Sequence, residues 1–219
     1  MALKPYQTRF IELAIEQNAL KFGSFELKSG RTSPYFFNAG QFSTGRSLLE
    51  LSRCYADAIV DSGTQYDLLF GPAYKGIPLA SSAASALMER HGISKPFSFN
   101  RKEAKKHGEG GSIVGAELKG DVMIVDDVIT AGTAIREVNE IILDAGAKPV
   151  AVVIGIDRCE RGQSEQSAVQ EVEEKLGVTV CSIVTVHTIR DFLARDSSNA
   201  VLVSTIDEYL MRYGVALND

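Results

Sequence analysis

Apolar residues follow two different spacings that alternate along most of the chain. Short continuous apolar runs predict buried strands, whereas apolar residues three and four positions apart predict amphipathic helices. The expected strands cover residues 67–70, 96–100, 122–125, 148–156 and 178–186. The expected helices cover residues 5–20, a segment starting near 44, residues 77–90, a segment from 134 to 145, and residues 164–176, 188–195 and 204–212. This alternation predicts an α/β fold with an open, mostly parallel sheet and helices on both faces.

Two segments depart from that alternation. Residues 24–39 predict two short strands around a turn at residues 28–31. Residues 101–116, RKEAKKHGEGGSIVGA, begin with basic side chains and continue with four glycines, which predicts a mobile loop rather than a core element. Ligands of open parallel sheets bind at the carboxyl ends of the strands, so we expect the loops that follow the strands to form the site.

The composition narrows the class of protein. The chain has 219 residues, of which 45% are hydrophobic, and this is enough for a single well-buried domain. A net charge of −5 argues against nucleic acid as a partner. Cys54, Cys159 and Cys181 lack metal-ligand spacing and predict buried, reduced thiols. Without an apolar leader or an 18-residue apolar run, we expect a cytoplasmic protein with no membrane partner.

The segment VMIVDDVITAGTA, residues 122–134, carries the clearest chemistry. A buried strand ends at Asp126 and Asp127, and a turn of small and hydroxyl residues leads into a helix. The free amides of a helix N-terminus bind anions, and Thr130 and Thr133 add hydroxyl donors. The two carboxylates suit sugar hydroxyls beside that anion, so the segment predicts a site for a phosphoribosyl group. The alternative is an ordinary strand–helix turn with Asp127 near the helix cap.

A second turn of similar type follows the strand at 67–70, in the segment GPAYKGIP at residues 71–78. Lys75 precedes a helix N-terminus, where a cation is unfavourable unless an anion lies nearby. We interpret Tyr74 and Lys75 as contacts for a pyrophosphate. The alternative is an exposed lysine in a loop.

The basic segment contains Arg101, Lys102, Lys105, Lys106 and His107. Such clusters are usually solvated faces or nucleic-acid patches. In an acidic protein, with glycines following, a lid over a polyanion is the better interpretation. Such a lid would stabilise charge on a departing pyrophosphate and exclude water from the reacting carbon.

Two further segments offer contacts for a flat, acidic base. The segment FELKSGRTSPYFFNAG, residues 25–40, contains Lys28 with Phe36 and Phe37, which point to opposite faces of a strand. The segment DRCERG, residues 157–162, places Arg158 at a strand end, where its guanidinium fork suits a planar carboxylate. The alternatives are one core aromatic beside one site aromatic, and a surface arginine.

The segment at 122–134 resembles the PRPP (5-phosphoribosyl 1-pyrophosphate) motif of the type I phosphoribosyltransferases. Together with the other four segments, in the same order, it resembles the orotate phosphoribosyltransferase family over nearly the whole chain. The resemblance implies transfer of phosphoribose from PRPP to orotate, giving orotidine 5′-monophosphate and pyrophosphate in pyrimidine biosynthesis. It implies one domain over residues 1–219, with residues 1–40 forming a hood over the base. It also implies Mg²⁺ held mainly by PRPP and water, and a homodimer in which residues 101–116 reach the neighbouring site.

The resemblance also implies the site residues. It assigns orotate to Lys28, Phe36, Phe37, Thr130 and Arg158. It assigns PRPP to Lys28, Tyr74, Lys75, Arg101, Lys102, Lys105, His107, Asp126, Asp127, Val128, Ile129, Thr130, Ala131, Gly132, Thr133 and Ala134. The catalytic set is Lys28, Lys75, Arg101, Lys102, Lys105, His107, Asp126 and Asp127.

Two other functions compete with this interpretation. A phosphoribosyltransferase for a purine or another base would differ only at the base site, and Lys28 with Arg158 favours an acidic base. A regulator that binds PRPP without turnover would need a DNA-binding segment. The first 25 residues predict one helix and no helix-turn-helix, which disfavours that function.

Overall fold

A six-stranded sheet forms the centre of the protein in the computed structural model, which describes residues 3–27, 29–105, 111–130, 132–162 and 164–215. The sheet has the order β5-β4-β3-β6-β7-β8, and every neighbouring pair is parallel except β4 with β5. Its strands are β3 (Leu68–Gly71), β4 (Phe97–Lys105), β5 (Gly111–Gly115), β6 (Asp121–Val125), β7 (Lys148–Asp157) and β8 (Thr179–Thr185). The predicted mostly parallel sheet is therefore confirmed.

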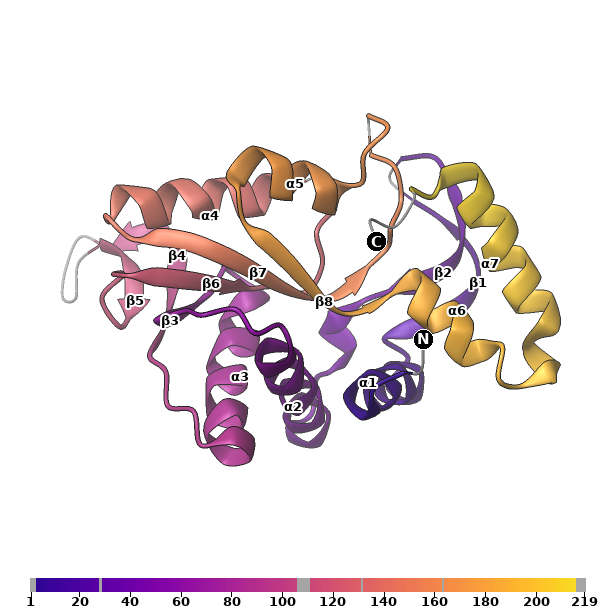
Figure 1. Ribbon diagram of the computed structural model, residues 1–219, viewed down its shortest axis with the longest axis horizontal. Coiled ribbons are helices and arrows are strands. Elements are labelled where there is room, and N and C mark those ends of the chain that lie inside the picture. Colours follow the sequence, from indigo (N-terminus) through magenta and orange to yellow (C-terminus); the bar gives the residue numbers. More distant parts are fainter. Residues whose placement is uncertain (1–2, 28, 106–110, 131, 163, 216–219) are drawn as a thin grey trace.

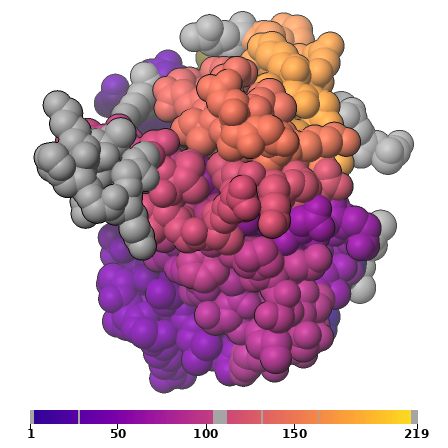
Figure 2. Space-filling view, turned by 90° about the vertical axis from the view of Figure 1, so that its left-hand side faces the viewer, coloured from indigo at the N-terminus to yellow at the C-terminus, as the bar shows by residue number. Residues whose placement is uncertain are grey.

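Helices cover both faces of this sheet (Figure 1). On one face lie α1 (Pro5–Glu16), α2 (Gly45–Asp61) and α3 (Gly76–His91), and on the other α4 (Thr133–Asp144) and α5 (Ala168–Leu176). Figure 2, seen from the β5 side, shows the same two layers. The strands are buried on both faces because their side chains alternate between two cores. In β6, Met123 and Val125 join one core, whereas Val122 and Ile124 join the other.

A small hairpin lies beyond the β8 end of the sheet (Figure 1). Strands β1 (Leu20–Glu26) and β2 (Thr32–Phe37) pair antiparallel, and the short helix η1 (Ala39–Gln41) follows them. Helices α6 (Val186–Leu193) and α7 (Ala200–Tyr213), joined through η2 (Ser197–Asn199), close the chain next to the hairpin. Tyr209 of α7 meets Tyr35 of β2 edge-on, with ring centroids 6.2 Å apart. The hairpin is thus anchored to the C-terminal helices as well as to the main core.

Three predicted helix ends were wrong by four residues, and the helix expected at 188–195 covers Val186–Leu193 instead. The first helix ends at Glu16 rather than at residue 20, because Asn18 adopts a φ of 55° and Leu20 already begins β1. The helix expected from 164 begins at 168, where Ser167 and Gln170 form a capping box. The last helix covers Ala200–Tyr213 rather than 204–212.

The basic segment at 101–116 was predicted to be a loop, and this was also wrong for its described part. Strand β4 continues to Lys105, and β5 returns antiparallel to it, with Asn100 opposite Ile113 and Lys105 opposite Gly111. Residues 106–110, including Lys106 and His107, lie outside the described residues. The basic residues from Arg101 to Lys105 belong to β4, beyond the last residue, Phe99, that pairs with β3, and they are next to the edge strand β5.

The chain reverses its direction across the sheet between β3 and β6. From β3 the chain passes through α3 to β4 on one side, and from β6 it passes through α4 to β7 on the other. The carboxyl ends of β3 and β6 consequently lie side by side with their loops diverging. Open α/β sheets bind ligands in the crevice at such a switch point.

A hydroxyl from α2 supports the end of β6. Tyr55 is fully buried and donates a hydrogen bond of 2.8 Å to the carbonyl oxygen of residue 126. We expect Tyr55→Phe to lower the free energy of unfolding by about 1–3 kcal/mol, because it leaves a buried carbonyl without its partner. Urea unfolding followed by circular dichroism measures this loss.

Tyr66→Phe is the matched control for that substitution. The Tyr66 hydroxyl is also buried but has no hydrogen-bond partner among the described residues, so its removal should cost little or be stabilising. Equal losses for the two variants would contradict a specific role for the Tyr55 hydrogen bond.

Candidate active site at the switch point

The turns after β3 and β6 are joined by an ion pair. The Lys75 ammonium lies 2.7 Å from Oδ2 of Asp127, and the Asp127 side chain is only 9% exposed, against 57% for Lys75. The turns can approach because residue 76 is glycine: a Cβ there would lie 2.8 Å from the carbonyl oxygen of Val125 and 2.5 Å from Cδ of Pro72. The anion that we expected beside Lys75 is thus supplied, within the chain, by the second turn.

The acidic pair is fixed by the backbone around it. The amide of Asp126 donates to the carbonyl of Val153 in β7, and the carbonyl of Asp127 accepts from the amide of Gly155. Oδ1 of Asp126 accepts a hydrogen bond of 2.9 Å from the amide of Asp127. Burial, followed by the adjacent charge of Asp127, raises the pKa of Asp126 to about 7. Near neutral pH, both the protonated and the ionised form of Asp126 are therefore populated.

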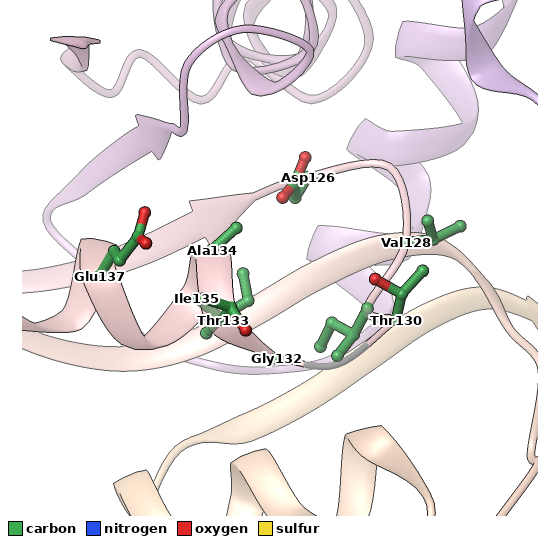
Figure 3. A pocket seen from close by; sticks show the side chains of 9 residues that line it. Asp126, Val128, Thr130, Gly132, Thr133, Ala134, Ile135 and Glu137 are labelled. Atoms are coloured by element: carbon green, nitrogen blue, oxygen red, sulfur yellow. The ribbon is translucent and has the colours of Figure 1, made fainter. Parts of the chain in front are cut away.

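The turn between the acidic pair and α4 encloses a pocket (Figure 3). Figure 3 shows Asp126 at one side of the curved turn and Thr130 and Thr133 at the other. Gly132 adopts a left-handed φ of 68° and caps α4 without a side-chain hydrogen bond, so the first amides of the helix remain open to a ligand. The pocket is lined by Asp126, Val128, Ile129, Thr130, Gly132, Thr133, Ala134, Ile135 and Glu137. Negative charge binds favourably at such a helix N-terminus.

The turn at 72–75 is held against β4. The amide of Ala73 donates to Oδ1 of Asn100 at 2.9 Å, and the peptide bond between Ala73 and Tyr74 is cis. Tyr74 is exposed, and the Lys102 ammonium lies 5.3 Å from the centroid of its ring. The structure thus brings Tyr74, Lys75 and Lys102 to the same end of the sheet as the acidic pair.

Several predicted site residues fall partly or wholly outside the described residues. Lys28, His107 and Ala131 lie outside them. Lys105 ends β4, but its side chain is not described, whereas Arg101 is described as half-buried on the same strand. Their predicted contacts with PRPP or orotate stay predictions.

The two aromatic residues of β2 have different surroundings. Phe37 packs in the core against Phe10 and Phe42, with ring centroids 6.2 and 6.4 Å away. Phe36 is 41% exposed and lies beside Phe25, 5.6 Å between centroids. This is the arrangement of one core aromatic and one surface aromatic that alternation along a strand predicts.

Arg158 has partners that the sequence did not reveal. Its Nη2 donates to Oε1 of Glu160 at 2.7 Å and to Oγ of Ser33 at 3.2 Å, and its guanidinium lies 4.5 Å from the centroid of the Tyr35 ring. Nη2 belongs to both two-nitrogen edges of a guanidinium, so neither edge is free to act as a fork. The predicted fork is therefore not available in this arrangement, and single N–H donors remain.

Comparison with known proteins identifies the family. Residues 39–184 match the phosphoribosyl transferase domain, which includes both turns of the switch point. An orotate phosphoribosyltransferase of Pseudomonas putida is 57% identical over 213 residues, which cover 97% of this chain and 100% of that one. One from Marinobacter nauticus is 59% identical over 210 residues, covering 96% and 99% of the two chains. The chain belongs to the orotate phosphoribosyltransferase family.

The fold agrees with a solved member of that family. The crystal structure of an orotate phosphoribosyltransferase from Francisella tularensis superposes with a TM-score of 0.85, at 39% identity, and covers 94% of this chain and 98% of that one. The likeness therefore extends beyond the matched domain to the hairpin and the C-terminal helices. In the described part of the chain, no helix is long and apolar enough to cross a membrane.

The described part of the site contains few side chains that could bind a metal ion. Among the described residues, no group of three or more histidine, cysteine or acidic side chains is arranged to hold a metal ion. The acidic pair offers two carboxylates, one of them paired with Lys75. This donor set suits Mg²⁺ that keeps its waters and takes most of its ligands from a bound phosphate compound.

The raised pKa of Asp126 predicts a specific pH dependence of stability. The pKa of Asp126 is about 7 in the folded protein, above its ordinary value of 3.8. Between these two pH values the carboxyl is protonated in the folded protein and ionised in the unfolded chain. Stability should therefore fall as the pH rises from about 4 to about 7, by up to about 1.4 kcal/mol per pH unit from this group. Asp126→Asn keeps the Oδ1 acceptor and removes the charge, so its advantage over wild type should grow over that range and then level off.

Urea unfolding at several pH values measures the difference between the two proteins. Asp144→Asn, which removes an exposed carboxylate at the end of α4, is the matched control and should follow the wild-type slope. An Asp126→Asn curve that runs parallel to wild type between pH 4 and 7 would contradict the raised pKa.

Proposed function

We propose that this orotate phosphoribosyltransferase family member transfers the 5-phosphoribosyl group of PRPP to orotate, giving orotidine 5′-monophosphate and pyrophosphate in pyrimidine biosynthesis. The observation that carries the proposal is the junction of the two turns at the switch point. The ion pair of Lys75 and Asp127 places a cation of one turn beside the acidic pair of the other. This contact supports a site in which phosphate donors and acceptors for sugar hydroxyls lie next to one another, as a phosphoribosyl pyrophosphate would require.

PRPP would lie across both turns. The amides and hydroxyls from Thr130 to Ala134 suit its 5′-phosphate, because they form an open helix N-terminus. Asp126 and Asp127 suit the ribose hydroxyls, which donate hydrogen bonds to carboxylates. The pyrophosphate would then reach the donors of the other turn and of the basic ribbon. The proposed PRPP contacts are Lys28, Tyr74, Lys75, Arg101, Lys102, Lys105, His107, Asp126, Asp127, Val128, Ile129, Thr130, Ala131, Gly132, Thr133 and Ala134.

Orotate would bind between the main sheet and the hairpin, with residues 1–40 as a hood. Arg158 directly follows β7, the neighbour of β6, so Arg158 and the turn after β6 lie beyond the ends of adjacent strands. Thr130, Phe36 and Phe37 would contact the flat ring, and Lys28 would supply the positive charge for the carboxylate. Phe37 is partly buried and packs against the core, so it offers the ring less surface than the exposed Phe36.

The chemistry requires no strong base, because orotate is already an anion. The bond between C1 of the ribose and the pyrophosphate oxygen would lengthen first and give the sugar ring oxocarbenium character. Asp126 and Asp127 would favour that positive charge, and Lys28, Lys75, Arg101, Lys102, Lys105 and His107 would stabilise the departing pyrophosphate. Orotate nitrogen then bonds to C1 as the C1–O bond breaks. Mg²⁺ bound to PRPP would spread the charge of its oxygens, and the acidic pair would reach it through hydroxyls and water.

Absorbance at the orotate band, with purified protein, PRPP and Mg²⁺, tests this function. We expect orotate to be consumed only when both PRPP and Mg²⁺ are present, while adenine, hypoxanthine and uracil are left unchanged. Turnover of another base would overturn the roles of Lys28 and Arg158 but keep the PRPP site. Bound PRPP with no turnover of any base would contradict the enzymatic function.

We also propose a homodimer, in the cytoplasm, in which the ribbon at 101–116 serves the neighbouring site. The described part of the ribbon continues β4 to Lys105 and returns through β5, and its Lys102 side chain is exposed. In such a dimer, Lys105→Ala and Asp127→Asn would each damage the active sites through different subunits. An equal mixture of the two variants should regain about a quarter of wild-type activity, because half the dimers are mixed and each has one intact site.

That recovery is measured after the two variants are unfolded together and refolded, with each variant refolded alone as the control. Activity that stays at the mean of the two variants would show that the ribbon serves its own subunit.

A further inference from the structure

A buried carboxylate holds the arginine assigned to base recognition. Oε1 of Glu160 accepts two hydrogen bonds of 2.7 Å, one from Nη2 of Arg158 and one from the hydroxyl of Tyr35. The Arg158 guanidinium also lies over the Tyr35 ring, 4.5 Å from its centroid. Arg158, Glu160 and Tyr35 therefore form a closed triangle in which each member contacts the other two.

The triangle joins segments that are far apart in the sequence. Tyr35 and Ser33 belong to hairpin strand β2, whereas Arg158 and Glu160 follow β7 in the main sheet. The backbone of the loop is fixed as well: Glu160 forms a β-bridge with Gly214 beyond α7. The triangle is thus a point at which the hood, the main sheet and the C-terminal segment meet.

Burying the Glu160 carboxylate costs free energy of folding, because the charge loses its hydration. The Glu160 side chain is 10% exposed and that of Arg158 is 20% exposed. Buried ion pairs commonly contribute no more stability than apolar side chains of the same volume, because both charges lose their hydration. The contacts do fix the orientation of the Arg158 guanidinium, because Glu160 and Ser33 accept its hydrogen bonds and the Tyr35 ring covers one of its faces.

That orientation determines which N–H donors of Arg158 can reach a ligand. Its Nη2 is occupied by Glu160 and Ser33, whereas its Nε and Nη1 have no hydrogen-bond partner among the described residues. The charge of Arg158 is also largely balanced by Glu160. Arg158 is therefore a fixed source of single N–H donors, suited to ring or carboxylate oxygens, rather than a free cation.

We propose that Glu160 is a positioning residue for base recognition, which acts by holding Arg158 against Tyr35 with Nε and Nη1 directed to the base. The inference rests on the proposed function and deepens it. It predicts that Glu160 affects the binding of orotate but not that of PRPP, and that this effect requires Arg158.

A double-mutant cycle in the orotate assay tests this proposal. Glu160→Ala should raise the orotate KM roughly ten- to a hundredfold, the range expected for loss of a charge-assisted hydrogen bond, with the PRPP KM unchanged. In an Arg158→Ala background the same substitution should change the orotate KM by less than about twofold, since the group that it positions is absent. Glu160→Gln retains Oε1 as an acceptor, so its orotate KM should lie between those of wild type and Glu160→Ala.

Glu165→Ala is the matched control in the same loop. Its side chain is 92% exposed and pairs with Arg161 at 3.1 Å, so both Michaelis constants should stay at wild-type values. Thermal unfolding of every variant identifies loss of folding, and Glu160→Gln carries the test if Glu160→Ala unfolds. Additive effects in the cycle, a PRPP KM that rises in parallel, or an orotate KM that falls would each overturn the proposal. A wild-type protein that leaves orotate unconsumed would instead overturn the proposed function, before any variant is compared.

Discussion

The parallel pairing of β3 with β6 is the constraint on which the site depends. It places the carboxyl ends of two strands side by side, although the turns that follow them are about fifty residues apart in the chain. Lys75 and Asp127 can then form their ion pair, and Gly76 allows the first turn to approach the end of β6. A different neighbour for β6 would leave Lys75 before a helix N-terminus without an anion. The other parts of the site are arranged around this junction: the open N-terminus of α4 on one side, and Arg158 at the end of the next strand.

The same junction concentrates negative charge at a cost in stability. Asp126 and Asp127 are adjacent and both buried, and the pKa of Asp126 is raised accordingly. Tyr55 and the β7 backbone fix the acidic turn through its main chain, and Lys75 neutralises only one of the two carboxylates. A ligand that donates hydrogen bonds and brings a cation would stabilise such a site. A ribose with Mg²⁺ at its pyrophosphate supplies both, which makes the cost consistent with the proposed function.

The sequence predicted the central motif because its signals are local. Four apolar residues, two acids and a glycine-containing turn specify a strand, its end and the start of α4 within thirteen residues. The ribbon at 101–115 was mistaken for a loop because the second half of β4 carries charged residues and β5 is a short edge strand that begins and ends with glycine. Neither part has the continuous apolar pattern of the inner strands.

The surroundings of Arg158 could not be inferred from any local signal. Tyr35 meets Glu160 across 125 positions of sequence, and Glu160 itself appears in a charged segment that suggests solvent exposure. Only the docking of the hairpin onto the loop after β7 reveals that both side chains are buried.

The most direct test of the two-turn site is a crystal structure of the protein with PRPP and Mg²⁺. We expect the 5′-phosphate on the amides from Thr130 to Ala134, the ribose hydroxyls within hydrogen-bond distance of Asp126 and Asp127, and the pyrophosphate beside Lys75. PRPP bound elsewhere, or bound with its pyrophosphate on the α4 N-terminus and its ribose away from the acidic pair, would contradict the assignment.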